Sequence, residues 1–428
     1  MKAFDAFNLT DDRMPISFIQ IYAFLKKAYA LHNESIDPLR RRAILDACDE
    51  IIKGKFDDLF NLGMWGSATH TNMTVNRIVA TRASDLCDVA VDPHDHVNAG
   101  QSTNDTFLTV MHICLHMSIT KNTIPALRSL IEHIESRASE WVNVVKVGRT
   151  HMMDAVPIRL SQEWLAHAAN VKRSVDCLQQ SCDRLTSVPI GGTAIGSGLN
   201  SVGNVHSILQ SLSSLTGIEL KLCANLLSTQ SMLDQVSQAH AALLQVAHAL
   251  KKFASDVRLQ TSGPSAGLNE LRLDTPETGS SIMPAKKNTT GAEALIMTWM
   301  EIMGADVTVQ IAAASGEFQL NVFRPIVLHK CIATCRLIRN AVSLFREEVI
   351  ARVAPREEDI HHALLSSRSF GTAISPFVGY SAAATAISAA RDNRDLFRKW
   401  PAEVQRRALV NIMSSLRYPK GRGETPSA

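Results

Sequence analysis

The chain lacks the patterns that define several classes of protein. Its eight cysteines are scattered over 428 residues without a Cys-x-x-Cys spacing, which disfavours a disulfide framework or a zinc ribbon. Lys plus Arg (44) exceed Asp plus Glu (41) by only 3, and no five like charges follow one another. We therefore expect no nucleic-acid partner and no anionic membrane surface as partner.

Long apolar runs are missing as well. No such run reaches the roughly 18–20 residues of a membrane span, and the start at residues 1–6 lacks the apolar core of a signal sequence. These absences predict a cytoplasmic protein in a reducing compartment.

Glycine and proline are absent from four long stretches, which predicts long helices because strand proteins rarely continue so far without a turn. Within the third stretch, Leu243, Val246 and Leu250 are among the apolar residues that recur at helical spacing. Helices this long normally pack against other helices, so the expected fold class is all-α. The four stretches are 126–147, 158–188, 218–262 and 326–354.

Three regions follow from this organisation, and the chain is long enough for two or three domains. Residues 1–99 are expected to form a mainly helical domain of short helices and loops, and residues 100–354 a central bundle of long helices. The charged run at 356–359 is interpreted as a linker into a small helical domain over 355–428, with a frayed tail from 419.

The segment Gly279–Asn288 is the most informative part of the sequence. It places a hydroxyl pair (Ser280 and Ser281), a cation (Lys286) and an amide (Asn288) within ten residues. Its glycine and proline favour a loop whose backbone N–H groups can surround an oxyanion. A solvated Ser-rich turn is the alternative, and by itself the short motif favours that alternative.

Three further segments share this polar character with little side-chain bulk: 66–73, 96–105 and 148–155. Their hydroxyls and amides can fix a dicarboxylate in place without the titration problems that charged ligands bring. Each segment alone could be an ordinary capped turn. Four such segments in one helical chain favour a shared anion site.

In order and spacing these segments resemble the fumarase/aspartase superfamily, and within it class II fumarases. The resemblance runs from about residue 7 to 380. It implies three mostly helical domains and a homotetramer whose central helices form one bundle, with each active site assembled from three subunits. The matching segments are Ser67–Asn72, Gln101–Asp105, Gly148–Ala155, Gly191–Asn200, Gly279–Asn288 and Leu320–Pro325.

The resemblance also implies a reaction, the reversible hydration of fumarate to malate in the tricarboxylic acid cycle. It is an anti elimination or addition through an aci-carboxylate intermediate, and it needs no metal and no organic cofactor. By this resemblance Ser280 is the base, and Lys286 and Asn288 hold the carboxylate as its charge doubles. His151 with Glu293 handles the departing or attacking water. The implied contacts to the substrate carboxylates are Ser67, Thr69, Ser102, Thr103, Asn104 and Thr150.

Departures from the family pattern leave the leaving group open. Ala285 stands where fumarases usually have Gly and is shared with aspartases, whereas His151 stands where aspartases have Gln. The alternatives are therefore an aspartase-like lyase that releases ammonia or an amine, and a family member that has lost turnover. Asp92 and His94 replace the His and Asn of the family's secondary anion site, so we expect that site to be weak or absent.

His112 and His116 are one helical turn apart and could contribute to a metal site. No carboxylate pattern accompanies them, so the sequence favours a solvated helix face.

Overall fold

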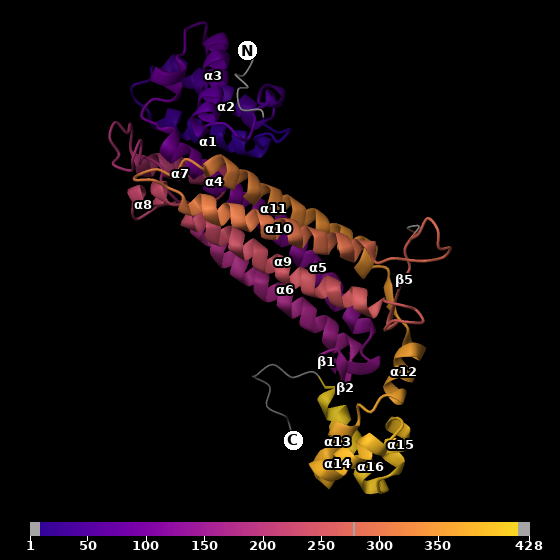
Figure 1. Cartoon of the computed structure of the whole chain (residues 1–428). Coiled ribbons are helices and arrows are strands. Elements are labelled where there is room, and N and C mark those ends of the chain that lie inside the picture. Colours follow the sequence, from indigo (N-terminus) through magenta and orange to yellow (C-terminus); the bar gives the residue numbers. More distant parts are fainter. Residues whose placement is uncertain (1–8, 277–278, 418–428) are drawn as a thin grey trace. The chain divides into compact units, whose positions relative to one another are not determined.

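The computed structural model describes residues 9–276 and 279–417 of the chain, and helices dominate them (Figure 1). The all-α prediction is confirmed. The longer helices are α1 (Ile16–His32), α2 (Pro38–Ile52), α3 (Ala68–Cys87), α4 (Thr103–Ser118), α5 (Ile124–Glu140), α6 (Leu160–Asp183), α7 (Val205–Thr216), α9 (Asp234–Gln260), α10 (Thr290–Ala314) and α11 (Arg324–Phe345).

Shorter elements fill the rest of the described chain. The remaining α-helices are α8 (Leu226–Ser231), α12 (Glu357–Ser366), α13 (Gly371–Val378), α14 (Tyr380–Ala389), α15 (Asn393–Arg398) and α16 (Ala402–Ser415). The strands form three two-stranded sheets: β1 (Val145–Thr150) with β2 (Met153–Arg159), β3 (Ser187–Val188) with β4 (Lys221–Leu222), and β5 (Leu271–Leu273) with β6 (Val353–Pro355). The 3₁₀ or π turns are η1 (Asp57–Leu59), η2 (Pro93–Val97), η3 (Ile119–Thr123), η4 (Arg184–Thr186) and η5 (Arg346–Ile350).

The chain forms two compact units, each assembled from three separate stretches. The first unit comprises Met1–Pro125, Ser174–Ala247 and Thr298–Asn340, and the second comprises Ala126–Arg173, His248–Met297 and Ala341–Ala428. The three domains expected from the sequence, with boundaries near residues 100 and 355, stay a prediction.

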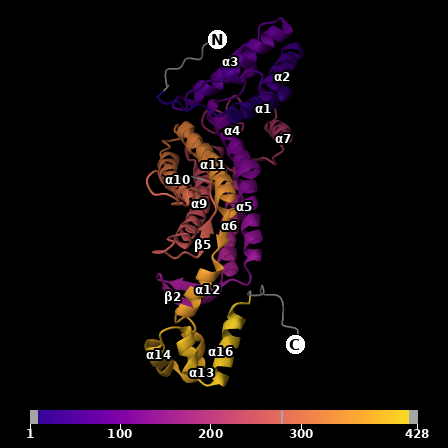
Figure 2. The same ribbon diagram turned by 90° about the vertical axis from the view of Figure 1, so that its right-hand side faces the viewer.

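The N-terminal part of the first unit is built on α1, which packs against α2, α4 and α7 (Figure 2). An aromatic cluster fills the contact between α1 and α4, where the ring centroids of Phe18 and Phe107 lie 4.7 Å apart. The prediction of only short helices before residue 99 is wrong, because α3 alone has 20 residues. Its interior contains neither glycine nor proline, so nothing in its backbone ends it early.

The prediction of a single helix over 218–262 is also wrong for the first part of that stretch. There the chain forms β4, the short helix α8 and then an extended residue, Met232, before α9 begins. The Asn225 side chain accepts a hydrogen bond from the Ser228 backbone N–H at 3.0 Å, so it caps a new helix at that point. Side-chain capping can therefore divide a stretch that has no glycine or proline.

Two other predicted helices are shorter than their glycine-free and proline-free stretches. Helix α5 ends at Glu140 and the chain enters strand β1, while α11 ends at Phe345 and continues as the π turn η5. The stretch 158–188 is closest to its prediction, since α6 covers Leu160–Asp183.

The charged run at 356–359 is not a linker. Its acidic residues form the first turn of α12, where the helix dipole favours negative charge. A small hydrophobic cluster of Ile374, Ala390, Leu396 and Ala408 then joins α13 to α16, as expected for a small helical C-terminal part. The predicted frayed tail from 419 lies outside the described residues.

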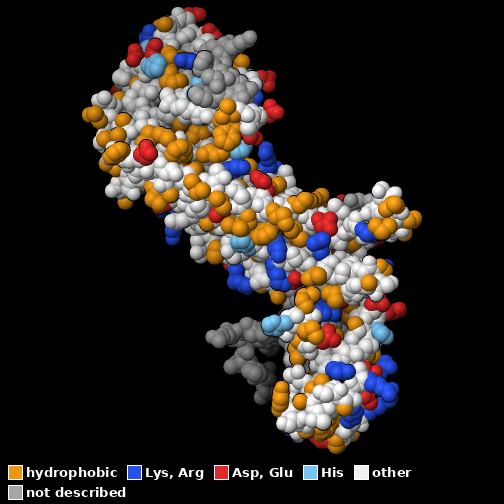
Figure 3. All heavy atoms as spheres, in the orientation of Figure 1, with side chains coloured by type: hydrophobic (Ala, Val, Ile, Leu, Met, Phe, Trp, Pro, Cys, Tyr) orange, Lys and Arg blue, Asp and Glu red, His pale blue; other side chains and the backbone are white. Residues whose placement is uncertain are grey.

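Helix α10 exposes apolar side chains along one side, and hydrophobic side chains gather over the long helices in Figure 3. Among the helices that the structure describes, it is the one that could cross a membrane by length and composition. The core helix of a soluble protein passes the same test. Its exposed apolar residues are Met297, Met300, Met303, Val307 and Ile311.

Candidate active site

Two helix N-termini of the first unit carry predicted substrate contacts. Ser67 caps α3, and its hydroxyl accepts a hydrogen bond from the Thr69 backbone N–H at 3.1 Å. Ser102 caps α4 in a capping box with Asp105, and its hydroxyl accepts from the Asn104 backbone N–H at 3.2 Å. Both ends therefore combine hydroxyl side chains with the partial positive charge of a helix N-terminus, which favours a carboxylate.

Asn72 brings these two segments together. Its side-chain amide donates to the Thr103 hydroxyl at 3.0 Å and to the Asn98 side-chain oxygen at 3.1 Å. Thr103 and Asn72 are both buried. The predicted clustering of the Ser67–Asn72 and Gln101–Asp105 segments is thus present in the first unit.

The residue Asn104 is fixed from two further directions. Its side-chain amide donates to the Ala194 carbonyl at 2.8 Å, within the segment Gly191–Asn200. Its own carbonyl accepts from the Arg324 guanidinium, which is only 2% exposed and also donates to the Gln230 carbonyl at 3.0 Å. Arg324 lies within the matching Leu320–Pro325 segment, but the family resemblance did not imply a role for it.

Asp105 is a fully buried carboxylate at the start of α4. It accepts from the Gly191 backbone N–H at 2.9 Å and from the Ser102 backbone N–H at 3.2 Å. Burial raises the pKa of Asp105 to about 6, although these hydrogen bonds oppose the shift. Its oxygens are occupied by backbone donors, so Asp105 holds the loop in shape.

In the second unit, His151 lies at the tip of the β1–β2 hairpin. Thr150 pairs with Met153, so His151 and Met152 form a two-residue turn, with φ of +54° and +63°. Such turns normally use Asn-Gly, because each non-glycine residue in left-handed geometry costs about 1–2 kcal/mol. The hairpin therefore holds an exposed imidazole in a strained position, a feature that often marks a functional site.

Buried ion pairs anchor the base of this hairpin. Lys146 lies 2.8 Å from the Glu163 carboxylate and 2.7 Å from that of Glu270, and Arg149 lies 2.6 Å from the other Glu270 oxygen. The Lys146 and Glu270 side chains are each 3% exposed. Removing one member of such a network leaves an uncompensated buried charge, so these pairs fix the hairpin on α6 and on the segment after α9.

The loop with the predicted base holds the Ser280 side chain by backbone donors. The Ser280 hydroxyl oxygen accepts hydrogen bonds from two backbone N–H groups, those of Met283 at 2.8 Å and Ile282 at 3.3 Å. Hydrogen bonds to a charged acceptor are about twice as strong as neutral ones. The loop is thus arranged to stabilise a negative charge on Ser280.

Lys286 and Asn288 close the same loop. The Lys286 ammonium donates to the Asn288 side-chain oxygen, and the Asn288 amide donates to the Gly279 carbonyl. A Cβ at position 279 would lie 2.2 Å from the Lys286 carbonyl oxygen, so only glycine fits there. Lys286 and Asn288 are therefore joined to each other and to Gly279, the residue before Ser280, and α10 begins directly after the loop at Thr290.

A hollow of about 450 Å³ lies beside this loop in the second unit. Lys286 and Asn288 line one part of it, and Asn269, Arg272 and Arg356 line another. Its charged side chains are all cationic, which suits an anionic ligand of the size of a dicarboxylate.

The predicted pair of His151 and Glu293 is not joined within the described part of this chain. The Glu293 carboxylate instead pairs with the Arg258 guanidinium at 3.1 Å. Both partners are partly exposed, so the ion pair contributes little stability. The cooperation of His151 with Glu293 stays a prediction that involves more than one subunit.

The histidine pair on α4 is placed differently from the sequence prediction. His112 is only 1% exposed, and its Nδ1 bonds the Ser187 carbonyl at 2.9 Å. A solvated helix face is therefore wrong for His112, because the helix turns this side toward β3. No metal-binding group of three or more His, Cys, Asp or Glu occurs among the described residues.

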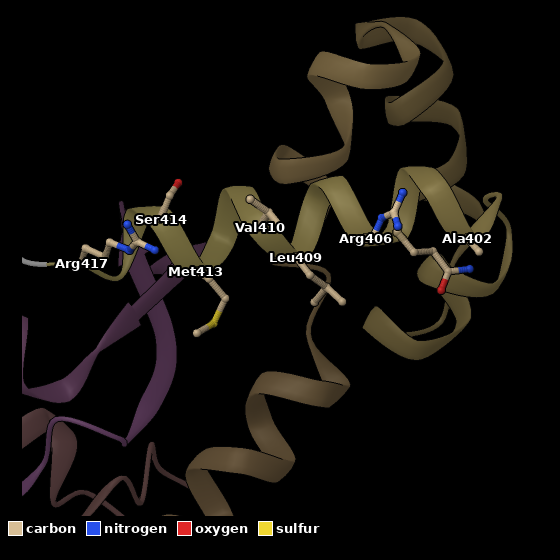
Figure 4. Close-up of a pocket in the computed structure, with 8 residues that line it drawn as sticks. Ala402, Arg406, Leu409, Val410, Met413, Ser414 and Arg417 are labelled. Atoms are coloured by element: carbon tan, nitrogen blue, oxygen red, sulfur yellow. The ribbon is translucent and has the colours of Figure 1, made fainter. Parts of the chain in front are cut away.

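A separate groove of about 580 Å³ runs along α16 (Figure 4). Leu409 and Met413 supply apolar walls, and Arg406 and Arg417 lie toward its two ends. No predicted site residue lines it, and nothing in the structure shows what covers it.

Comparison with known proteins supports the resemblance seen in the sequence. A protein-family model described as a lyase matches residues 1–304. The chain is 37% identical over 390 residues to a class II fumarate hydratase of Thermosynechococcus vestitus, covering 88% of this chain and 84% of the relative. It is 36% identical over 389 residues to that of Bacillus subtilis, with the same shares covered.

Solved structures agree with these relatives. The class II fumarase of Schistosoma mansoni superposes with a TM-score of 0.89 at 31% identity, covering 92% of this chain and 89% of that one. A fumarate lyase:delta crystallin of Brucella melitensis, bound to cobalt, superposes with a TM-score of 0.92 at 31% identity, covering 97% and 94%.

Proposed function

Because the chain belongs to the lyase family that includes the class II fumarate hydratases, we propose that it catalyses the reversible hydration of fumarate to malate. The observation that carries this proposal is the Ser280 hydroxyl oxygen held by two backbone N–H donors. A serine can act as a base only if its alkoxide is stabilised, and this loop supplies that stabilisation.

The base and the charge stabilisers then have distinct tasks. When malate is dehydrated to fumarate, Ser280 takes a proton from the carbon next to a carboxylate. The electrons of the broken C–H bond move into that carboxylate. The aci-carboxylate carries doubled negative charge, and the Lys286 ammonium and the Asn288 amide, which are hydrogen-bonded to each other, are proposed to hold it. Losing one such preorganised donor costs about 10²–10³ in rate.

The hydroxyl group must leave as water, and this step needs an acid. The exposed imidazole of His151 is proposed to donate this proton as the general acid. Glu293 is proposed to assist it from another subunit. In the hydration direction the same imidazole takes the proton from the attacking water.

The substrate carboxylates are proposed to bind at the N-termini of α3 and α4 and at the hairpin. The hydroxyl and amide groups there hold a dicarboxylate without adding titratable groups. The residues proposed for these contacts are Ser67, Thr69, Ser102, Thr103, Asn104 and Thr150.

A spectrophotometric assay tests this function. Purified protein is supplied separately with malate, aspartate and argininosuccinate, and the absorbance of fumarate is followed. Malate should give the fastest appearance of fumarate. The proposal is wrong if aspartate or argininosuccinate gives the faster reaction, or if none of the three is converted, which would favour the non-catalytic alternative.

One observation favours an amine lyase as the second candidate. Ala285 has φ +62° in the loop, a geometry that suits glycine, and fumarases usually have glycine there. Alanine at this position is shared with aspartases. His151 favours the fumarase function, because ammonia leaves readily once protonated and needs no such acid.

Assembly into a homotetramer is proposed from α10. Its exposed apolar row spans from Met297 to Ile311, and a row of this kind marks a surface that another chain covers. We propose that the covering chains form a homotetramer with shared active sites, and that the protein is cytoplasmic. Light scattering should give four chains per particle, whereas a stable active monomer, or sedimentation of the protein with lipid vesicles, would contradict the proposal.

Shared sites have their own test. When inactive His151→Ala and Ser280→Ala chains are mixed under conditions of subunit exchange, some activity should return, because intact residues from different chains meet in one site. No recovery despite demonstrated exchange would count against shared sites.

A further inference from the structure

A buried lysine in α1 faces the loop before α4. Lys26 is only 1% exposed, in a helix whose other buried side chains are uncharged. Its ammonium donates to the Gln101 side-chain oxygen at 2.9 Å and to the Asn98 side-chain oxygen at 3.0 Å. Its hydrogen-bond acceptors are therefore two neutral amide oxygens.

The Asn98 side-chain oxygen is the junction of this arrangement. Besides Lys26, it accepts from the side-chain amides of Asn72 and Asn76, each at 3.1 Å. Asn72 also donates to the hydroxyl of Thr103, a proposed substrate contact. Two amide side chains thus connect the buried ammonium to the carboxylate-binding loop.

We propose that Lys26 is a positioning residue for the dicarboxylate site, acting through Asn98 and Gln101 on the loop that presents Ser102, Thr103 and Asn104. This inference rests on the proposed function. A charged donor is needed here because three donors converge on one amide oxygen, and a charge-assisted bond is the strongest of the three. The ammonium also places a positive charge below a loop that binds an anion, where low dielectric extends its field.

The surroundings of Lys26 make its charge sensitive to pH. Burial lowers the pKa of Lys26 to about 7, and the neighbouring Asp105 and Cys48 oppose this shift. The aromatic ring of Tyr22 lies 5.6 Å from the ammonium and also favours the charged form. The ammonium is thus present below about pH 7 and is lost as the pH rises through it. The affinity for a dicarboxylate should therefore fall as the pH rises.

The test compares Lys26→Met with Lys27→Met. Lys27 is the next residue of α1, but it pairs with Asp49 and does not contact the loop. Binding of succinate, the saturated analogue of fumarate, is measured by calorimetry, and KM and kcat by the fumarate assay. Lys26→Met should raise KM and the succinate Kd about 10-fold or more while kcat stays within about 3-fold, because the loop binds substrate and transition state alike. Lys27→Met should match the wild type.

If Lys26 had only a structural role, Lys26→Met would lower the melting temperature but would not raise KM at a nearly constant kcat. Unchanged succinate affinity in a folded Lys26→Met protein overturns the proposal. If Lys26→Met does not fold, the proposal is tested by measuring the succinate Kd of the wild type between pH 6 and 8.5. It should rise with pH in the wild type and rise clearly less in Lys26→Arg, whose guanidinium remains protonated. A flat wild-type profile, or the same rise in Lys26→Arg, overturns the proposal.

The two proposals fail in different ways. Succinate binding does not require turnover, so a wild-type protein that binds succinate without hydrating fumarate refutes the proposed function only. A wild type that hydrates fumarate, together with a folded Lys26→Met variant of normal KM, refutes the role of Lys26 only.

Discussion

Replacing Ser280 with alanine separates chemistry from loop stability. The hydroxyl oxygen accepts two backbone N–H bonds, from Ile282 and Met283. As an alkoxide it would gain about 1.5–3 kcal/mol from each bond to a charged acceptor, or about 3–6 kcal/mol in total. As a neutral hydroxyl in a partly exposed loop it gains about 0.5–1.5 kcal/mol from each. The substitution should therefore affect turnover much more than folding.

The expected loss follows from these magnitudes. Ser280→Ala should lower kcat about 10³-fold or more, which corresponds to about 4 kcal/mol in the activation barrier. The free energy of unfolding should change by only about 1–3 kcal/mol, since the freed N–H groups can bond water. Turnover is followed by fumarate absorbance, unfolding by denaturant titration, and dicarboxylate binding by succinate calorimetry, which should be nearly unchanged.

Ser281 offers the matched control. It is exposed, adjacent in sequence, and makes no hydrogen bond through its side chain to any described residue. Ser281→Ala should keep nearly full turnover. The assignment of the base is refuted if Ser280→Ala turns over at a near-normal rate, or if Ser281→Ala loses as much activity as Ser280→Ala.

His151→Gln should cut hydration about 10²-fold or more, the usual scale for a lost acid–base group, and an unchanged malate rate would show that another group supplies the proton. Gly279→Ala should displace the loop, because its Cβ would lie 2.2 Å from the Lys286 carbonyl oxygen. We expect a kcat loss of about 10-fold or more with the fold retained, and full activity would mean that the loop tolerates a side chain there. Burial lowers the pKa of His112 to about 4, below its unfolded value, so stability present above about pH 6.5 is lost as the pH falls toward 4. Denaturant titrations should show a loss of about 3 kcal/mol at pH 4 that His112→Asn largely removes, and equal pH profiles would contradict this origin.

The fold class could be predicted because long stretches without glycine or proline are rare outside helical proteins. Helix ends could not be predicted in the same way. The division of 218–262 depends on the Asn225 side chain bonding the Ser228 N–H, a local competition between capping and helix propagation that composition does not resolve. Likewise, the acidic run after Pro355 suits both a solvated linker and the first turn of α12.

The candidate site could be proposed from the sequence where its polar residues lie in short segments. The loop from Gly279 to Asn288 shows its hydroxyls, cation and amide directly in the sequence. Supporting residues are far from those segments along the chain, and they look ordinary. In the sequence, Lys26 looks like an ordinary lysine of an amphipathic helix. Only the packing of α1 against the loop before α4 shows what its ammonium contacts.

The strained turn at His151 and Met152 has a consequence for protein engineering. A search for heat-resistant variants should repeatedly select Asn-Gly at these two positions, because that pair adopts left-handed geometry without strain. Each such variant would gain thermal tolerance and lose the proposed proton donor. A screen that scores only survival on heating would therefore enrich inactive proteins, whereas one that leaves this hairpin tip unchanged would avoid the conflict.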